Sequence, residues 1–341
     1  HEQGSSIREL LNDIDLAPDV CWTVRGTEER HGLLLAEIYM LLNELWSCAP
    51  ASWLINYGYS KFTYPCISAA FQNDVAVAHI HDSDSSINDS KKKPRLEKVV
   101  STISDVHFTT GLNIKNSLIS EGVDERNIYS VGSTIPDFSR DVIGCKILEQ
   151  KVSSSFREFI NKTLDGFSHT KIVAIEANPS FAHFQDFSLL IQDRSELYPE
   201  YKVLFFSPYE SHLKTNIENR GFSNTLNTLT LPQWDRYFLF TRSFCVLSES
   251  SETIDEARAF GALGLLLRDQ TRRFDLLADG QVKLGGIEPT EWLNRLKVII
   301  EKCSLKHEFR RLQSQTTLAN LSATQQIASA LTNRISEISQ R

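Results

Sequence analysis

Short apolar runs alternate with amphipathic stretches along most of this chain. The runs predict strands at 51–57, 74–80, 105–108, 128–131, 171–175, 201–206, 244–247 and 263–267. The stretches between and after them predict helices at 61–71, 111–120, 145–164, 183–193, 210–219, 253–260 and 320–338. Buried strands separated by helices are typical of parallel sheets that are covered on both faces.

The alternation of predicted strands and helices is interrupted once, in the middle of the chain. This pause predicts an α/β fold with two Rossmann-like domains that face a cleft. The expected parts are an N-terminal domain at 1–145, a connector helix at 146–166, a C-terminal domain at 167–318 and a C-terminal packing helix at 319–341. Ligands of open parallel sheets bind beyond the carboxyl ends of the strands, so the residues after each strand are the ones to examine.

Composition narrows the class of protein. The 341 residues are 41% hydrophobic and 23% charged with a formal net charge of −7, which is ordinary for a globular protein and gives no reason to expect nucleic-acid binding. No apolar run is long enough to span a membrane, and no export signal is visible. The six cysteines have no metal-binding spacing, so we expect reduced thiols in a cytoplasmic protein without a metal or other cofactor.

The first candidate site follows the strand at 74–80. The segment His79–Ser86 places His81 and Asp82 near the ligand end of the predicted sheet. A histidine titrates near neutrality and can act as a general acid or base. Adjacent side chains on a strand point to opposite faces, which weakens a direct His81–Asp82 pair. A polar exit from the strand, with the histidines bonded to the backbone, explains this segment equally well.

The second candidate site follows the strand at 244–247. Ser250 and Ser251 open a predicted helix, and Glu256 lies within it. The first N–H groups of a helix and its dipole suit a phosphate, and a carboxylate can accept hydrogen bonds from sugar hydroxyls. After the next strand, Arg272 or Arg273 could reach a diphosphate. Simple helix capping alone would also explain the serines.

Three collinear stretches resemble the non-hydrolysing UDP-N-acetylglucosamine 2-epimerases, a family of GT-B architecture. They are Asp105–Thr110, Leu118–Asp137 and Ser250–Asp269 with the following Thr271–Arg273. The resemblance implies a UDP-sugar ligand. It implies that Glu256 contacts the ribose, that Ser250 and Ser251 form the phosphate turn, and that Arg273 is the basic residue near the diphosphate.

The departures from the family concern its acid/base chemistry. Tyr59 stands where the resemblance expects an aspartate, and His81 stands where it expects a glutamate. Ser251 and Glu252 replace two glycines of the phosphate turn, and a glutamate there adds repulsion. The candidate catalytic residues are therefore His81, Asp82 and Tyr59, and the candidate UDP-binding residues are Ser250, Ser251, Glu256 and Arg273.

Three functions remain open at this point. The first is a diverged epimerase-like protein that binds or processes a UDP-type nucleotide sugar. The second is a glycosyltransferase of the same fold, with His81 or Asp82 as the base that activates an acceptor hydroxyl. The third is a non-catalytic homologue that serves as a partner subunit or scaffold.

The resemblance starts inside the family's first domain. His1–Gly4 resembles the segment after the family's second strand, so the first βαβ portion is expected to be absent from this chain. A sheet without its central strand would expose an apolar edge. We therefore expect a homo-oligomer, or a partner chain that supplies the strand.

Overall fold

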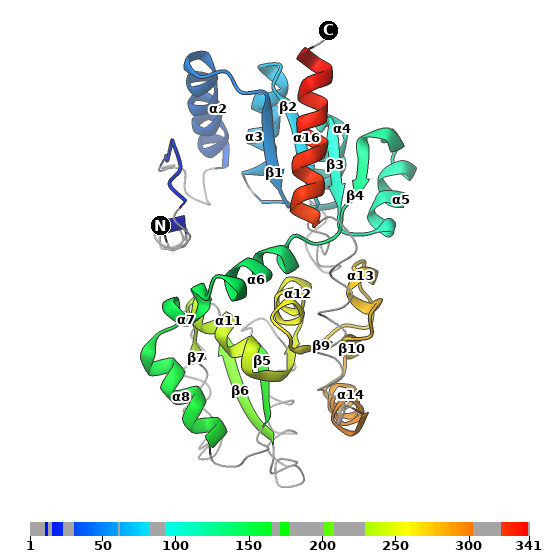
Figure 1. The fold of residues 1–341 in the computed structure, drawn as a ribbon. Coiled ribbons are helices and arrows are strands. Elements are labelled where there is room, and N and C mark those ends of the chain that lie inside the picture. The colour runs from blue at the N-terminus through cyan, green and yellow to red at the C-terminus, as the bar shows by residue number, and fades with distance from the viewer. Residues whose placement is uncertain are drawn as a thin grey trace. The chain divides into compact units, whose positions relative to one another are not determined.

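The computed structural model describes residues 11–12, 16–22, 31–60, 62–81, 93–165, 171–176, 201–207, 229–302 and 322–339, and the statements below concern these residues. The chain divides into two compact units, His1–Val131 with Ser329–Arg341, and Gly132–Ala328. Each unit contains one sheet of parallel strands (Figure 1). The α/β class is therefore confirmed. The domain limits after residues 145, 166 and 318 remain predictions.

The first unit is built on a four-stranded sheet. Its strands are β1 (Trp53–Tyr57), β2 (Ala76–Ile80), β3 (Val106–Thr109) and β4 (Ile128–Ser130), in the order β1-β2-β3-β4. Its helices are α2 (His31–Cys48), α3 (Thr63–Gln72), α4 (Lys93–Ile103) and α5 (Leu112–Ser120), and a short 3-10 helix spans Glu125–Asn127. All four predicted strands of this half are confirmed. Helix α4 begins at Lys93, in a stretch for which no helix was predicted.

The core of the first unit forms around a helix that the sequence analysis did not predict. Helix α2 buries Leu34, Ile38, Leu42 and Trp46, which are spaced four residues apart and therefore share one face. This face packs against buried residues of α3 and against Val77 of β2. Val77 belongs to the same face of the sheet as His79 and His81, because side chains alternate along a strand. His79 and His81 therefore lie on the face of the sheet that α2 and α3 cover.

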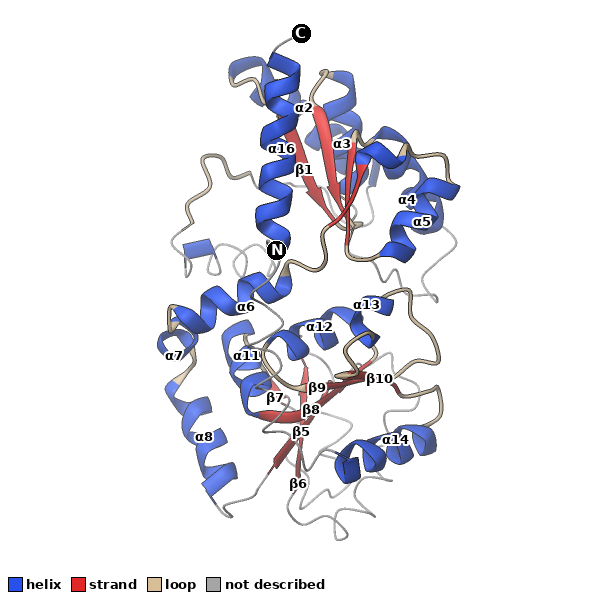
Figure 2. Cartoon of the chain, turned by 45° about the vertical axis from the view of Figure 1, so that its right-hand side comes forward, coloured by secondary structure: helices blue, strands red, loops and turns tan. Residues whose placement is uncertain are grey.

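The second unit is built on a six-stranded parallel sheet in the order β10-β9-β8-β5-β6-β7 (Figure 2). Its strands are β5 (Lys171–Glu176), β6 (Tyr201–Ser207), β7 (Leu229–Thr230), β8 (Ser243–Ser248), β9 (Leu263–Leu266) and β10 (Val282–Leu284). Its helices are α6 (Ile135–Gly144), α7 (Ile147–Lys151), α8 (Ser154–Asp165), α11 (Gln233–Arg242), α12 (Ser251–Ala259), α13 (Phe274–Leu277) and α14 (Pro289–Lys302). The predicted strands of this half are confirmed. The predicted helices 183–193 and 210–219 lie outside the described residues.

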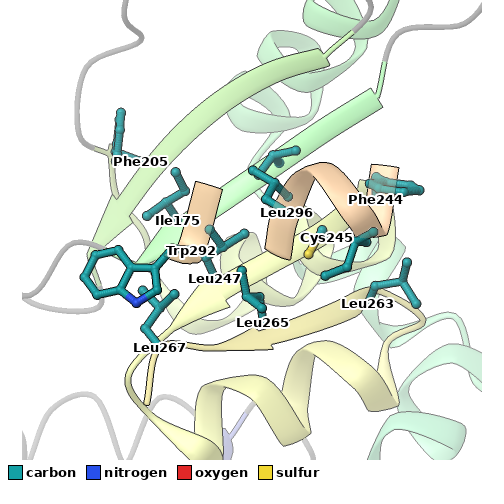
Figure 3. Packing of buried hydrophobic residues seen from close by; sticks show 12 residues of the cluster. Ile175, Phe205, Phe244, Cys245, Leu247, Leu263, Leu265, Leu267, Trp292 and Leu296 are labelled. Atoms are coloured by element: carbon teal, nitrogen blue, oxygen red, sulfur yellow. The ribbon is translucent and has the colours of Figure 1, made fainter. Parts of the chain in front are cut away.

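One face of this sheet carries a large hydrophobic cluster (Figure 3). Side chains of β5, β8 and β9 pack there against Trp292 and Leu296 of α14. The Trp292 indole N–H donates to the Gly286 carbonyl at 2.9 Å, which satisfies its polar atom inside the cluster. Strand β8 is buried at every position, so its carboxyl end is held rigidly where the second candidate site begins.

The predicted single helix at 145–164 is wrong, because the chain forms two helices there. Val152 is extended between α7 and α8. The Asp235 carboxylate accepts from the Ser153 backbone N–H at 2.8 Å and from its hydroxyl at 2.7 Å. Asp235 is itself buried in α11, so this tertiary contact replaces the hydrogen bonds that a continuous helix would make.

The predicted C-terminal helix is present as α16 (Ala323–Ser339). The Asp137 carboxylate accepts from both the N–H and the hydroxyl of Thr324 at 2.9 Å, which caps its first turn. Ala323, Ile327 and Leu331 form its buried stripe. None of the helices in the described ranges is both long and apolar enough to span a bilayer.

Gly264 provides a test of the packing between α12 and β9. A Cβ atom at this position would lie 2.7 Å from Ile254 Cγ2 and 3.1 Å from Val282 Cγ2. We expect Gly264→Ala to lower the free energy of unfolding by about 1–3 kcal/mol, because neither branched side chain can move without opening the core. Chemical denaturation followed by tryptophan fluorescence measures this loss.

The control is Gly144→Ala at the end of α6, where nothing lies within 4 Å of an added Cβ. This variant should unfold within about 0.5 kcal/mol of the parent or slightly above it. Equal stability of the two variants would contradict the packing described for Gly264.

Candidate functional site

The candidate site of the first unit is a row of polar residues across three strands. Asn56 of β1 is in register with His79 of β2, and His79 is in register with His107 of β3. Their side chains therefore point to the same face of the sheet. His79 and His107 are completely buried, and His81 is 2% exposed. Such groups must find hydrogen-bond partners within the protein.

These residues bond mainly to one another. Asn56 Nδ2 lies 2.8 Å from His79 Nδ1 and also donates to the Gly58 carbonyl at 3.1 Å. The Tyr59 hydroxyl lies 2.8 Å from His81 Nδ1. His81 Nε2 lies 3.1 Å from His107 Nδ1. The result is a continuous hydrogen-bonded chain from Tyr59 through His81 to His107.

The turn after β1 places Tyr59 over the histidines. Gly58 has a φ of 63°, which a residue without a side chain adopts at little cost. Its N–H donates to the Ile80 carbonyl at 2.9 Å, and the N–H of His81 donates to the Phe108 carbonyl at 2.8 Å. Backbone hydrogen bonds thus hold both ends of the Tyr59–His81 contact. Tyr59 itself is only partly buried.

Burial keeps the three histidines neutral. Desolvation, followed by the charge of His107, lowers the pKa of His79 to about 3. Desolvation and the two neighbouring histidines lower the pKa of His81 well below its usual value. Desolvation also lowers the pKa of His107 to about 4, although the Ser104 carbonyl and the Asp105 carboxylate oppose the change. A neutral imidazole has one donor and one acceptor nitrogen, so every hydrogen bond in the row has a direction.

The structure brings two of the three predicted catalytic residues together. Tyr59 and His81 are in direct contact, whereas Asp82 lies outside the described residues. Asn56 and His107 were not among the predicted site residues. A signal for His107 existed, because it stands in the strand that follows the one carrying His79 and His81. Among the described residues no group of three or more His, Cys, Asp or Glu side chains is arranged to hold a metal ion.

The candidate site of the second unit begins where β8 meets α12. Ser250 is the N-cap of α12, and its hydroxyl accepts from the Thr253 N–H at 3.2 Å. The Ser248 hydroxyl accepts from the Ser250 N–H at 2.8 Å and bonds to the Glu176 carboxylate. Ser251 is buried in the first turn. Ser250 therefore caps the helix, as the simpler interpretation of the serines expected. Its hydroxyl already forms a hydrogen bond to the backbone of α12.

Glu256 faces two side chains of α11. The Arg236 guanidinium lies 3.0 Å from one carboxylate oxygen, and the Tyr237 hydroxyl lies 3.3 Å from the other. Burial raises the pKa of Glu256 to about 7, and this effect outweighs the opposite influence of Arg236. Burial and the charge of Glu256 raise the pKa of Tyr237 to about 12. Glu256 can therefore change its protonation state near neutrality.

Arg273 lies in a buried ion-pair network. Its guanidinium donates to the Asp275 carboxylate through Nε and Nη2, and Nη2 also donates to Asp255 at 2.7 Å. Asp255 pairs in addition with Arg258 at 3.4 Å. The side chain of Arg273 is 4% exposed. In this structure Arg273 joins α12 to the segment before α13.

Comparison with known proteins identifies the family. Residues 1–332 match the family model described as UDP-N-acetylglucosamine 2-epimerase. The chain belongs to this family. The resemblance seen in the sequence is therefore confirmed.

The curated relatives of this family member are distant. A UDP-N-acetylglucosamine 2-epimerase of Neisseria meningitidis is 24% identical over 280 residues, which cover 78% of this chain and 72% of the relative. A putative enzyme of the same name from Clostridium acetobutylicum is 23% identical over 292 residues, which cover 82% of this chain and 72% of the relative. Low identity over most of both chains describes a diverged member of the epimerase family.

Solved structures of epimerases share the fold. The Neisseria meningitidis enzyme bound to UDP-GlcNAc has a TM-score of 0.70 at 19% identity and covers 99% of this chain and 89% of its own. The Methanocaldococcus jannaschii enzyme in complex with UDP-GlcNAc and UDP has a TM-score of 0.70 at 16% identity and covers 96% of this chain and 88% of its own. The expected GT-B-like fold is confirmed.

The two candidate sites predict opposite responses to acid. The histidines have lower pKa values in the folded protein than in the unfolded chain, so the unfolded state binds more protons below pH 6.5 and the first unit loses stability as pH falls. At pH 5.5 the loss is about 1.4 kcal/mol for each of His79 and His107. Glu256 has a raised pKa, so the folded state binds more protons between about pH 4.5 and 7, and the second unit is stabilised on acidification.

Hydrogen exchange followed by mass spectrometry measures both effects in one sample. We expect peptides from β1–β3 to lose protection between pH 7.5 and 5.5, after correction for intrinsic exchange rates. Peptides from β8 and α12 should keep or gain protection. Parallel losses in both units would contradict these pKa directions.

Proposed function

We propose that the chain is a diverged UDP-N-acetylglucosamine 2-epimerase-like protein that binds or processes a UDP-type nucleotide sugar. The observation that carries this proposal is the position of Glu256, a largely buried carboxylate next to the β8–α12 turn. The family resemblance assigns the ribose contact to this residue. A carboxylate can accept hydrogen bonds from both hydroxyls of a ribose.

The phosphate side of the proposed site differs from a simple anion site. The N-terminus of α12 offers backbone donors next to Ser250 and Ser251. Glu252 lies exposed in the same turn and adds a negative charge where a diphosphate would approach. Arg273 supports the turn by holding Asp255, and direct contact with a phosphate would require it to release part of this network. These features favour weak binding of the diphosphate.

The candidate catalytic residues of this proposal stay Tyr59, His81 and Asp82 of the first unit. Standard epimerase chemistry relies on carboxylates, so the replacement of two of them by Tyr59 and His81 argues for altered chemistry. His81 as the base of a glycosyltransferase has less support, because both of its ring nitrogens are engaged. A non-catalytic homologue is the alternative that the same replacements favour.

Calorimetric titration tests the nucleotide site. We expect UDP and UDP-N-acetylglucosamine to bind in the micromolar to millimolar range, and Glu256→Ala to weaken both at least tenfold, because the ribose loses its acceptor. The matched control is Glu301→Ala in α14, where the side chain is 56% exposed. This control should bind as the parent does. No binding by a folded parent sample would refute the proposed function and leave the scaffold alternative.

The raised pKa of Glu256 predicts the pH dependence of binding. The carboxylate is ionised above about pH 7 and accepts hydrogen bonds best in that form. We therefore expect the affinity for UDP-N-acetylglucosamine to rise about tenfold from pH 6 to pH 8. This ligand has no phosphate group that titrates in the range. Glu256→Gln should bind with nearly the same affinity at both pH values, and an unchanged pH dependence in this variant would assign the effect to another group.

A further inference from the structure

The two carboxylate oxygens of Glu256 differ in what they already accept. Oε1 accepts from the Tyr237 hydroxyl at 3.3 Å and from Arg236 Nη2 at 3.3 Å. Each carboxylate oxygen has two lone pairs, so Oε1 is fully engaged. Oε2 lies 3.0 Å from the same Arg236 nitrogen, which occupies one side of it. Among the contacts of the described residues, Oε2 therefore keeps one acceptor position and Oε1 keeps none.

The contact between Tyr237 and Oε1 has a defined direction. Gln233 Nε2 donates to the Tyr237 oxygen, so the hydroxyl hydrogen of Tyr237 is directed at Glu256. The Tyr237 side chain is 3% exposed, and its ring stacks on Phe260 with 4.6 Å between the ring centroids. Packing therefore holds the hydroxyl at Oε1.

Arg236 serves this carboxylate. Its Nε atom is buried without a hydrogen-bond partner, and within the described part of the chain Glu256 is the carboxylate that pairs with it. The two side chains are 15% and 18% exposed, so solvent ions screen their attraction less than that of a surface pair. Residues 233–260 all belong to the second unit, and the arrangement does not depend on the first.

We propose that Arg236 and Tyr237 are positioning residues that hold Oε1 of Glu256, so that only Oε2 receives the ligand and the site recognises one ribose hydroxyl. The two hydroxyls of a ribose need one acceptor position each, and the carboxylate has a single position left. The identity of the ligand as a uridine diphosphate rests on the proposed function. The engagement of Oε1 rests on the contacts within the second unit alone.

A cycle that combines ligand and protein changes tests the single acceptor position. UDP, 2′-deoxy-UDP and 3′-deoxy-UDP are titrated at pH 8 into the full chain and into Glu256→Ala. Ligand-detected nuclear magnetic resonance follows binding, because it also measures millimolar dissociation constants. We expect the loss of one hydroxyl to weaken binding about tenfold in the parent and not in Glu256→Ala. Loss of the other hydroxyl should have the same effect in both proteins.

Tyr237→Phe tests the hold on Oε1 with the same ligands. The variant keeps the ring that packs on Phe260 and frees one lone pair of Oε1. Loss of the second hydroxyl should now weaken binding several-fold, and Tyr237→Phe combined with Glu256→Ala should abolish this effect. If both hydroxyls or neither depend on Glu256 in the parent, the single acceptor position is refuted while binding of UDP stands.

Titration of the Glu256 carboxyl group tests the positioning residues without a ligand. Carbon-13 resonances of the glutamate carboxyl groups follow it, and the resonance that disappears in Glu256→Gln identifies it. Arg236→Gln and Tyr237→Phe should both raise the pKa of Glu256 above its value of about 7, because each removes a group that favours the carboxylate. Arg236→Lys keeps the charge and should give a pKa closer to that of the parent.

The matched control is Arg242→Gln, which makes the same charge change at an exposed position of α11. It should leave the pKa of Glu256 in place. A pKa that also stays in place in Arg236→Gln or in Tyr237→Phe would overturn the hold on Oε1, whatever the ligand. If UDP does not bind, the proposed function and the hydroxyl contact fail together, and the carboxyl titration alone decides whether Arg236 and Tyr237 position Glu256.

Discussion

Burial of the central strands on both faces is the constraint on which both units depend. Strands β3, β8 and β9 are buried at every position, so any polar side chain on them must be paired within the protein. In the first unit this constraint acts on His107, which has no access to water. In the second unit it acts on Ser248 at the end of β8, which bonds to Glu176. The hydrogen-bonded polar groups of each unit therefore lie on a buried strand or directly at its end.

The two units use this constraint differently. The first unit collects neutral groups, because three adjacent histidines without a carboxylate among them cannot all be charged in a dry interior. The second unit collects charges that compensate one another, as Arg236 with Glu256 and Arg273 with Asp255. A neutral hydrogen-bonded row suits proton transfer over short distances, whereas paired charges suit the recognition of a polar ligand. The paired charges of the second unit support the nucleotide site that is proposed there.

Helix α12 connects packing with the proposed function. Its buried side, with Ile254, presses directly on Gly264 of β9, which fixes the distance between helix and sheet. Asp255 holds Arg273, and the next residue along the chain is Glu256. The packing side and the ligand side of the helix are thus adjacent. A substitution that moves the helix would also displace the carboxylate, so loss of binding in core variants has to be compared with their stability.

The sequence by itself determined eight of the ten described strands, because a short apolar run such as Phe244–Leu247 is typical of a buried strand in a parallel sheet. Strands β7 and β10 were not predicted. The sequence also determined the family and the candidates Tyr59, His81 and Glu256. The four-residue spacing of Leu34, Ile38, Leu42 and Trp46 was a signal for α2, but this helix was not among the predicted elements. Only the tertiary structure decided that the predicted helix at 145–164 breaks at Ser153, because Asp235, which causes the break, is distant in sequence. Likewise, only strand register could place His107 beside His81, since pairing between strands depends on backbone hydrogen bonds that no local pattern encodes.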